Sequence, residues 1–465
     1  MSKLKDQMFS ELADKSIFNR ALDIAFEYAG SVLDRNVFPT EEALANLDKF
    51  DENLPVSSGK TLDILEQIHS LGSPATIAQI GGRYFGLVNG GIVPAALAVK
   101  YITDFWDQNT PLYLSSPIVS KLESVVERWL VELFGLPLET AAGFVSGTSM
   151  AILCGLAAGR WRIYNRLNYD VNSKGLIGAP KIRIVMGRHA HGTVLKAVAL
   201  LGLGHESIEW VDVDNQGRIL PDNIPVLDDR TILILQAGNV NSGSFDDFEN
   251  ICGRAQEAGA WLHIDGAFGL WAAASKTINY LTKGIERANS WSVDGHKTLN
   301  TPYDNGIVLC KDKVALVSAL QATGSYILYG KNRDGMLYTP EMSRRARIVE
   351  LWATMKYLGK EGMDSMITDL HYRAKQFAEE LSQIKGFTIL NDIAFNQVLA
   401  RCETDDITKK TIAQIQDLRE CWVGGASWFG QNVIRISVCS WATTEKDVTR
   451  SVQSFARAHD LVLAE

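Results

Sequence analysis

The region from 261 to 300 constrains this chain most, because it contains two short apolar runs that each lead to a chemically reactive side chain. The first run, Trp261–Asp265, ends in a carboxylate. The second run, Ser290–Asp294, leads into His296 and Lys297. Short runs of β-branched and aromatic residues near glycine favour buried strands over helices. The sequence therefore predicts two strands of an α/β sheet, one ending in an acid and the other leading to a lysine.

The surrounding sequence alternates between predicted strands and predicted helices. Further strands are predicted at 182–186, 208–213, 231–235 and 306–310, and helices at 151–160, 194–201 and 246–258. This alternation is typical of a doubly wound, mainly parallel sheet with helices on its faces.

Asp265 and Lys297 are expected to face one crevice, because ligands in such sheets bind beyond the carboxyl ends of the strands. This pair suits pyridoxal 5'-phosphate. A lysine forms the Schiff base with that cofactor, and a carboxylate keeps its ring nitrogen protonated. We therefore predict a pyridoxal phosphate site between the two strand ends.

Two further motifs fit this prediction, although each has an ordinary structural explanation. Gly147, Thr148 and Ser149 precede an apolar helix, and a helix N-terminus offers free N–H groups and a positive dipole to a phosphate. A common capped helix start would look the same. His191 follows a predicted strand and could lie against a planar ring, or it could simply begin the next helix.

The length of 465 residues indicates two or three domains. We predict a helical arm over residues 1–80, a large α/β domain over 81–340 and a small α+β domain over 341–465. The arm has helical spacing at 16–34 and 62–71 and little core of its own, so it should pack on another domain or another subunit. A segment with five glycines, 81–91, indicates either a close approach of backbone to a ligand or a tight turn.

Composition excludes several classes of function. The chain carries 46 basic and 54 acidic residues, a net charge of -8, which is the wrong sign for binding nucleic acid or an anionic membrane. No apolar run is long enough to span a membrane. The six cysteines form no metal-ligand pattern, so we expect no metal, free thiols and a cytoplasmic protein.

Several motifs, taken together, resemble one family. Residues 294–297 are Asp-Gly-His-Lys, residues 263–267 are His-Ile-Asp-Gly-Ala, residues 191–194 are His-Gly-Thr-Val, and residues 434–438 are Ile-Arg-Ile-Ser-Val. From about Gly82 to Asp447 the chain is similar to the group II pyridoxal-phosphate-dependent amino acid decarboxylases. These are fold-type I proteins that include glutamate and aromatic-L-amino-acid decarboxylases.

The resemblance implies a role for each matching residue. It makes Lys297 the Schiff-base lysine, and Asp265 the acid on the ring nitrogen. The other implied contacts are Ala267 beneath the ring, His191 stacked on its face, His296 on the phosphate side, Gly147, Thr148 and Ser149 on the phosphate, and Arg435 on the substrate carboxylate.

Three positions depart from the family pattern. The usual Asn-Pro before His-Lys is here Asp294-Gly295, which places an acid near the cofactor with no evident partner. The Gly-Thr-Thr turn is replaced by residues 238–241, Gly-Asn-Val-Asn. For the family's proton-donating tyrosine we predict Tyr338, which is in a different register and with which Tyr329 competes, and His191 is the other candidate for that proton transfer.

The resemblance therefore implies decarboxylation of an L-amino acid to an amine and CO2, in a homodimer with the active site near the subunit interface. Other reactions of this cofactor remain open, namely transamination, carbon–carbon cleavage and an aldehyde-forming variant. A non-catalytic binding protein with the same fold is the remaining alternative.

Overall fold

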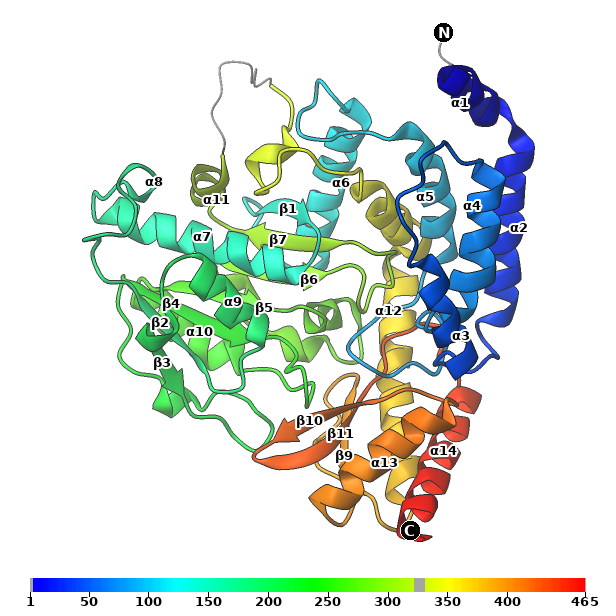
Figure 1. Ribbon diagram of the computed structural model, residues 1–465. Helices are drawn as coiled ribbons and strands as arrows, with labels where there is room; N and C mark the ends of the chain where they lie inside the picture. The colour runs from blue at the N-terminus through cyan, green and yellow to red at the C-terminus, as the bar shows by residue number, and fades with distance from the viewer. Residues whose placement is uncertain (1–2, 322–330, 465) are drawn as a thin grey trace.

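The computed structural model describes residues 3–321 and 331–464. It contains a large seven-stranded sheet covered by helices, a small four-stranded sheet beside it, and N-terminal helices along one side (Figure 1). Helix α12 (Ile348–Ser382) runs from the large sheet to the small one.

The large sheet has the strand order β1-β7-β6-β5-β4-β2-β3. Strands β2 to β6 are parallel to one another, and β7 is antiparallel to both of its neighbours. The strands are β1 (Ala141–Val145), β2 (Arg183–Gly187), β3 (Ile208–Val211), β4 (Thr231–Gln236), β5 (Trp261–Asp265), β6 (Ser290–Asp294) and β7 (Gly306–Cys310). The mainly parallel α/β sheet expected from the sequence is confirmed.

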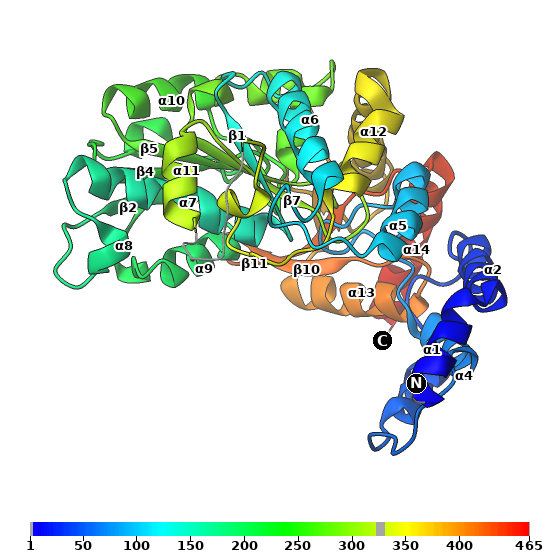
Figure 2. The same ribbon diagram turned by 90° about the horizontal axis from the view of Figure 1, so that it is seen from above.

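Each face of this sheet carries its own apolar core, because side chains alternate along a strand. In β4, Ile232 and Ile234 belong to one cluster, and Leu233 and Leu235 belong to the other. Helices on the first face are α7 (Thr148–Arg166), α8 (Val171–Lys174), α9 (Gly192–Leu200) and α11 (Lys313–Leu320). Helices on the second face are α6 (Pro117–Leu133) and α10 (Phe248–Glu257), with the first half of α12 (Figure 2).

The small sheet is antiparallel, with the order β10-β11-β9-β8. Its strands and helices are β8 (Thr388–Ile389), β9 (Gln397–Arg401), α13 (Asp405–Leu418), β10 (Gly424–Trp428), β11 (Gln431–Ser437) and α14 (Glu445–Ala464). Phe85 packs into this core beside Phe377. The glycine-rich segment 81–91 therefore leads from the arm into the small sheet.

Strands β1 and β10 were not predicted from the sequence, because their residues are poor strand formers. β1 is Ala-Ala-Gly-Phe-Val and β10 is Gly-Gly-Ala-Ser-Trp, and both contain the small residues that sequence patterns associate with turns. Each is defined by antiparallel pairing with a stronger neighbour. Helix α12 is kinked at Gly359, where φ is 58°.

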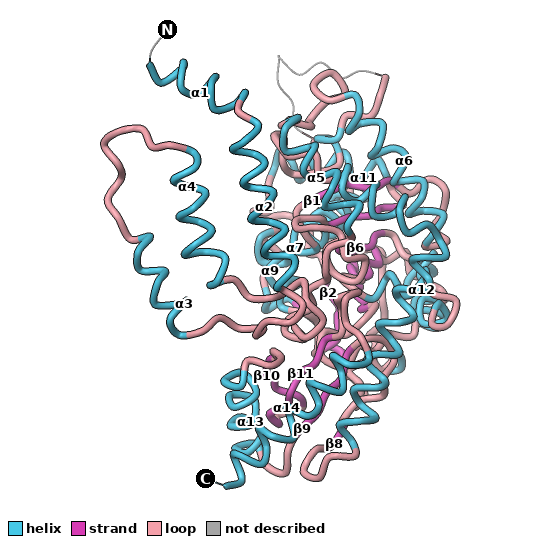
Figure 3. The backbone as a smooth tube through the Cα atoms, turned by 90° about the vertical axis from the view of Figure 1, so that its right-hand side faces the viewer, coloured by secondary structure: helices cyan, strands magenta, loops and turns pink. Residues whose placement is uncertain are grey.

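The N-terminal helices stand apart from the sheets (Figure 3). They are α1 (Lys3–Ala13), α2 (Lys15–Ser31), α3 (Glu41–Ala45) and α4 (Thr61–Gln67), followed by α5 (Pro94–Trp106). Helix α1 buries no residue, and its Phe9 and Leu12 are 62% and 66% exposed. Across the described residues, every helix is too short or too polar to cross a bilayer.

Candidate active site

A cavity of about 240 Å³ lies at the carboxyl ends of β4, β5 and β6. The residues expected to bind the cofactor all line it, together with Thr193, Gln236, Gly238, Val240, Phe268 and Asp294. Parallel pairing places Gln236 beside Asp265, and Asp265 beside Ser292. The register of the sheet therefore brings the predicted acid to the floor of one crevice with the predicted lysine.

Asp265 is buried at the end of β5. Its Oδ1 accepts hydrogen bonds from the Ala267 N–H at 3.2 Å and the Ser292 hydroxyl at 3.4 Å. Burial raises the pKa of Asp265, while the nearby His191 and Lys297 act to lower it. A carboxylate in this position favours a cationic N–H partner, which a protonated pyridine ring supplies.

Lys297 follows β6, and its Nζ lies 3.2 Å from Asp294 Oδ2. Asp294 is 1% exposed, and both of its oxygens are bonded to Thr148. The Thr148 N–H donates to Oδ1 at 2.7 Å, and the Thr148 hydroxyl donates to Oδ2 at 2.8 Å. Asp294, the acid that departs from the family pattern, is therefore paired with the start of α7 and with Lys297.

The glycine-rich segment approaches the backbone beside this lysine. The Gly90 N–H donates to the His296 carbonyl at 3.3 Å, and a Cβ at Gly90 would collide with the Lys297 carbonyl oxygen. Gly91 donates its N–H to the Asn300 side chain. Gly90 therefore approaches the backbone of the chain itself, which is neither of the two explanations left open for segment 81–91.

The N-terminus of α7 forms one wall of the cavity. Gly147 is the N-cap and has no side chain to satisfy the first N–H groups. Within residues 3–321 and 331–464, the Ser149 N–H has no acceptor. The free N–H, the Ser149 hydroxyl and the positive end of a long helix suit an anion such as phosphate.

His191 is the N-cap of α9, and its Nδ1 accepts the Thr193 N–H at 3.2 Å. The neutral imidazole therefore carries its proton on Nε2. Burial lowers the pKa of His191, with Asp265 opposing this effect. The expected stacking histidine is thus a neutral ring held by its own helix cap.

His296 is fixed by two contacts that lie beyond β6. Its Nδ1 accepts the Asn305 N–H at 2.9 Å, and its ring stacks on Tyr303 with centroids 4.2 Å apart. Its Nε2 is 3.5 Å from Asp294 Oδ2. Tyr303 was not singled out from the sequence, because nothing in its local pattern distinguishes it from an ordinary loop tyrosine.

Arg435 comes from β11 of the small sheet and lies beside the cavity without lining it. Its Nη1 donates to the carbonyl of Val240, a cavity residue, at 3.4 Å. No carboxylate of the described chain forms an ion pair with it. Burial lowers the pKa of Arg435, with Tyr84 opposing this effect.

Tyr338 does not line the cavity, contrary to the expectation that it donates a proton there. It is 5% exposed and belongs to the core on the α7 face of the sheet. The Arg333 guanidinium covers its ring at 4.1 Å from the centroid. Tyr329 lies outside the described residues.

The amide of Asn239 does not replace the hydroxyl that the family pattern places in this turn. Its Oδ1 accepts the N–H groups of Asn241 at 2.9 Å and Ser242 at 3.3 Å. Its Nδ2 donates to the His189 carbonyl at 3.3 Å. Asn239 therefore holds the turn together, and Gly238 and Val240 line the cavity.

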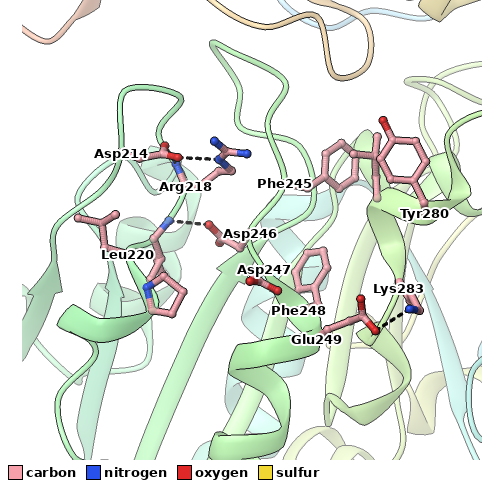
Figure 4. Close-up of a pocket in the computed structure, with 13 residues that line it drawn as sticks. Asp214, Arg218, Leu220, Phe245, Asp246, Asp247, Phe248, Glu249, Tyr280 and Lys283 are labelled. Atoms are coloured by element: carbon pink, nitrogen blue, oxygen red, sulfur yellow. Dashed lines mark hydrogen bonds and ion pairs between the residues drawn. The ribbon is translucent and has the colours of Figure 1, made fainter.

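A second cavity, of about 370 Å³, opens beside the N-terminus of α10 (Figure 4). Four of its charged residues form two ion pairs, Arg218 with Asp214 at 2.7 Å and Lys283 with Glu249 at 2.8 Å. Its buried Asp246 accepts the N–H of Gln236, which lines the first cavity. Among the described residues that line this second cavity, the one lysine, Lys283, is already paired with Glu249, so the cavity offers no free amine for a cofactor.

The first cavity fits pyridoxal phosphate by the chemistry of its donors. Asp265 offers an anion for the ring nitrogen, and Lys297 offers an amine for the aldehyde. The start of α7 offers the phosphate an unbonded N–H and a hydroxyl from Ser149. These groups come from three different elements and converge on a single space.

Comparisons with known proteins identify relatives of this chain. Mouse acidic amino acid decarboxylase GADL1 is 25% identical over 330 residues, 68% of this chain and 59% of the relative. The aromatic-L-amino-acid decarboxylase of Bacillus atrophaeus is 24% identical over 428 residues, 85% of each protein. Oryza sativa TDC, solved with PLP and tryptamine, superposes with a TM-score of 0.88 at 19% identity, covering 96% of this chain and 97% of that one. It shows the same fold.

The match to mouse GADL1 spans less than two thirds of that relative's length. The family model for the pyridoxal-dependent decarboxylase conserved domain matches residues 45–402. That segment covers the whole large sheet, both strand ends and the lysine that follows them. With a matching fold and a cavity that suits the cofactor, this chain belongs to the pyridoxal-dependent decarboxylase family.

Proposed function

We propose that the protein removes the α-carboxylate of an L-amino acid as CO2 and releases the amine. The observation that carries this proposal is Arg435, a partly buried cation beside the cavity with no acid partner in the described chain. A buried charge without a partner is costly. A substrate carboxylate would supply the missing partner through paired hydrogen bonds.

The other residues would divide the remaining work. Pyridoxal phosphate, when bound, supplies a ring that withdraws electrons from the bond to be broken at the substrate Cα. Lys297 would hold the cofactor through Nζ, and Asp265 would keep a proton on the ring nitrogen. Ser149 and the start of α7 would hold the phosphate.

His191 would orient the cofactor and return a proton after CO2 leaves. Its Nε2 carries the hydrogen, because Nδ1 accepts from Thr193. To return that hydrogen, the ring would first take up a proton at Nδ1, which lies 2.7 Å from the Thr193 hydroxyl oxygen, because a neutral imidazole that lost its Nε2 hydrogen would become an unfavourable anion. Among the described cavity residues, this imidazole is the group that we assign to the step.

The test is a panel of acidic, aromatic and diamino L-amino acids, with CO2, amine and keto acid each measured. We expect CO2 and amine in equal amounts for at least one member. Release of a keto acid without CO2 would show that the reaction is transamination and not decarboxylation. Absence of every product across the panel would favour a binding protein.

We also propose that the protein works as a homodimer in the cytoplasm. Met8, Phe9 and Leu12 are exposed along α1 and line an open apolar cavity of about 680 Å³ with Phe18 of α2. Apolar surfaces of this kind mark contacts between proteins. All six cysteines are free and buried, which suits a reducing compartment.

Light scattering tests the dimer. The double variant Phe9→Asp, Leu12→Asp should shift the mass from two chains to one, because it places charge in the apolar contact. Leu138→Asp is the control, since Leu138 is 93% exposed on a loop away from the arm. A monomeric parent protein would contradict the proposal.

A further inference from the structure

Asp294 is the acid that departs from the family pattern, and it already occupies groups that the cofactor needs. Its oxygens accept the N–H and the hydroxyl of Thr148, the first residue of α7. The same carboxylate pairs with the Lys297 ammonium at 3.2 Å. The acid therefore stands between the positive end of a helix and the reactive amine.

Several charged or titratable groups surround this carboxylate. Lys297 and His296 approach Oδ2, at 3.2 Å and 3.5 Å. Asp265 and Tyr303 are near enough to interact with it electrostatically. Lys297 is thus the cation that balances Asp294, and a phosphate dianion entering beside it would add like charge to a buried acid.

Two roles could explain these contacts. Asp294 could simply cap α7, since Gly147 at the N-cap has no side chain. Alternatively, it could compete with an anion for the same end of the helix. Both roles predict that removing the carboxylate makes the cofactor-free protein less stable, because charge-assisted hydrogen bonds are lost. Only competition predicts that an anion then binds more tightly.

We propose that Asp294 is an internal competitor of the cofactor phosphate, holding the start of α7 and the Lys297 amine until pyridoxal phosphate displaces it from one or both. This role rests on the proposed attachment of the cofactor at Lys297. Asp294 is a positioning residue that makes cofactor loading weaker than a neutral residue would. Loading then includes breaking contacts within the chain as well as making contacts to the ligand.

The test uses the cofactor-free protein and two ligands, inorganic phosphate and pyridoxal phosphate. Asp294→Asn removes the charge and keeps the size of the side chain. We expect it to lower the dissociation constants of both ligands by about tenfold or more, as for the loss of one like-charge contact. The melting temperature of the cofactor-free variant should fall at the same time.

The matched control is Asp312→Asn. Asp312 also caps a helix, α11, by accepting the Ala315 N–H at 2.9 Å, and it also pairs with a cation, Arg162, at 2.7 Å. It lies outside the cavity lining. This variant should lose stability without any change in either dissociation constant.

A second variant keeps the inference testable if Asp294→Asn fails to fold. Asp294→Ala removes the carboxylate together with both hydrogen bonds that hold it to α7, and leaves the Thr148 hydroxyl and N–H in place for an anion. Phosphate should bind severalfold more tightly to it. Unchanged or weaker phosphate binding in the soluble variants would overturn the competitor role.

The failure of this inference can be separated from failure of the proposed function. Borohydride reduction followed by peptide mapping shows whether the cofactor attaches to Lys297. Phosphate binding to the cofactor-free protein does not depend on that attachment. If the cofactor attaches to Lys297 but Asp294→Asn does not bind phosphate more tightly, the proposed function is retained and the competitor role of Asp294 is rejected.

Discussion

The two sides of the cavity differ in how completely the chain satisfies its own charges. On the cofactor side, formed by the large sheet and α7, Asp294 bonds to Thr148 and Lys297. On the proposed substrate side, Arg435 of the small sheet lies next to the cavity lining and has a single hydrogen bond to a carbonyl, at 3.4 Å. The chain therefore pairs the acid on the cofactor side with its own groups, and we infer that a ligand would supply the partner of Arg435.

This difference separates two functions that share one space. Preorganised partners hold reacting groups in place before the ligand arrives. A partly buried cation without an acid partner, such as Arg435, instead makes its strongest interaction with the ligand that neutralises it. Substitutions on the two sides should consequently alter different measured quantities.

The largest effect is expected on the cofactor side, at Lys297. Lys297→Ala should abolish turnover and the long-wavelength absorbance of lysine-bound pyridoxal phosphate, because no other amine lines the described cavity. Absorbance spectra and product assays check this. Lys283→Ala, which removes a surface partner of Glu249, is the control. A borohydride-reducible chromophore in Lys297→Ala would show that the lysine is misassigned.

Asp265 should have the next largest effect. Asp265→Asn should reduce turnover by roughly 10²–10³-fold, the scale seen when one preorganised electrostatic partner is removed. Pyridoxal phosphate should remain bound, since the contacts at Lys297 and α7 are untouched. The measurement is kcat beside the ratio of cofactor to protein, and full activity would refute the role on the ring nitrogen.

Arg435 tests the substrate side. Arg435→Met should raise KM by roughly 10–100-fold, the value of a hydrogen-bonded charge pair, and leave the affinity for pyridoxal phosphate unchanged. Arg401→Met is the control, because Arg401 on the adjacent strand pairs with Asp405 instead. If cofactor affinity fell as much as KM rose, the two sides would not be independent.

The smallest effect concerns the stability of the cofactor side and its dependence on pH. Burial lowers the pKa of His263 to about 3, while the unfolded chain retains the ordinary value near 6.5. The unfolded state therefore binds the proton first, and stability is lost as pH falls below 6.5. Between pH 6.5 and 5 this group should reduce the free energy of unfolding by about 2 kcal/mol.

Urea unfolding at the two pH values measures this loss. His263→Gln should reduce it, because glutamine takes up no proton. His205→Gln, on the surface, should leave it unchanged. An identical pH dependence in His263→Gln and the parent protein would contradict the assignment.

The sequence identified the cofactor side more completely than the substrate side. Asp265 and Lys297 are recognisable because each comes at or just beyond the end of a short apolar run, and parallel strand ends meet at one edge of a sheet. Arg435 was found only through the family resemblance, and Tyr303 was not found. Tyr338 was misplaced because its local sequence does not reveal that Arg333 covers its ring.

The sequence itself determined strands β2 to β7 and the two strand ends that carry Asp265 and lead to Lys297, because periodicity and strand boundaries depend on near neighbours along the chain. Tertiary structure alone decided the partners of Asp294, which reaches Thr148 across 146 residues, and the opposition of Arg435 to the large sheet. Those pairings depend on how separate elements pack, and no local pattern records them.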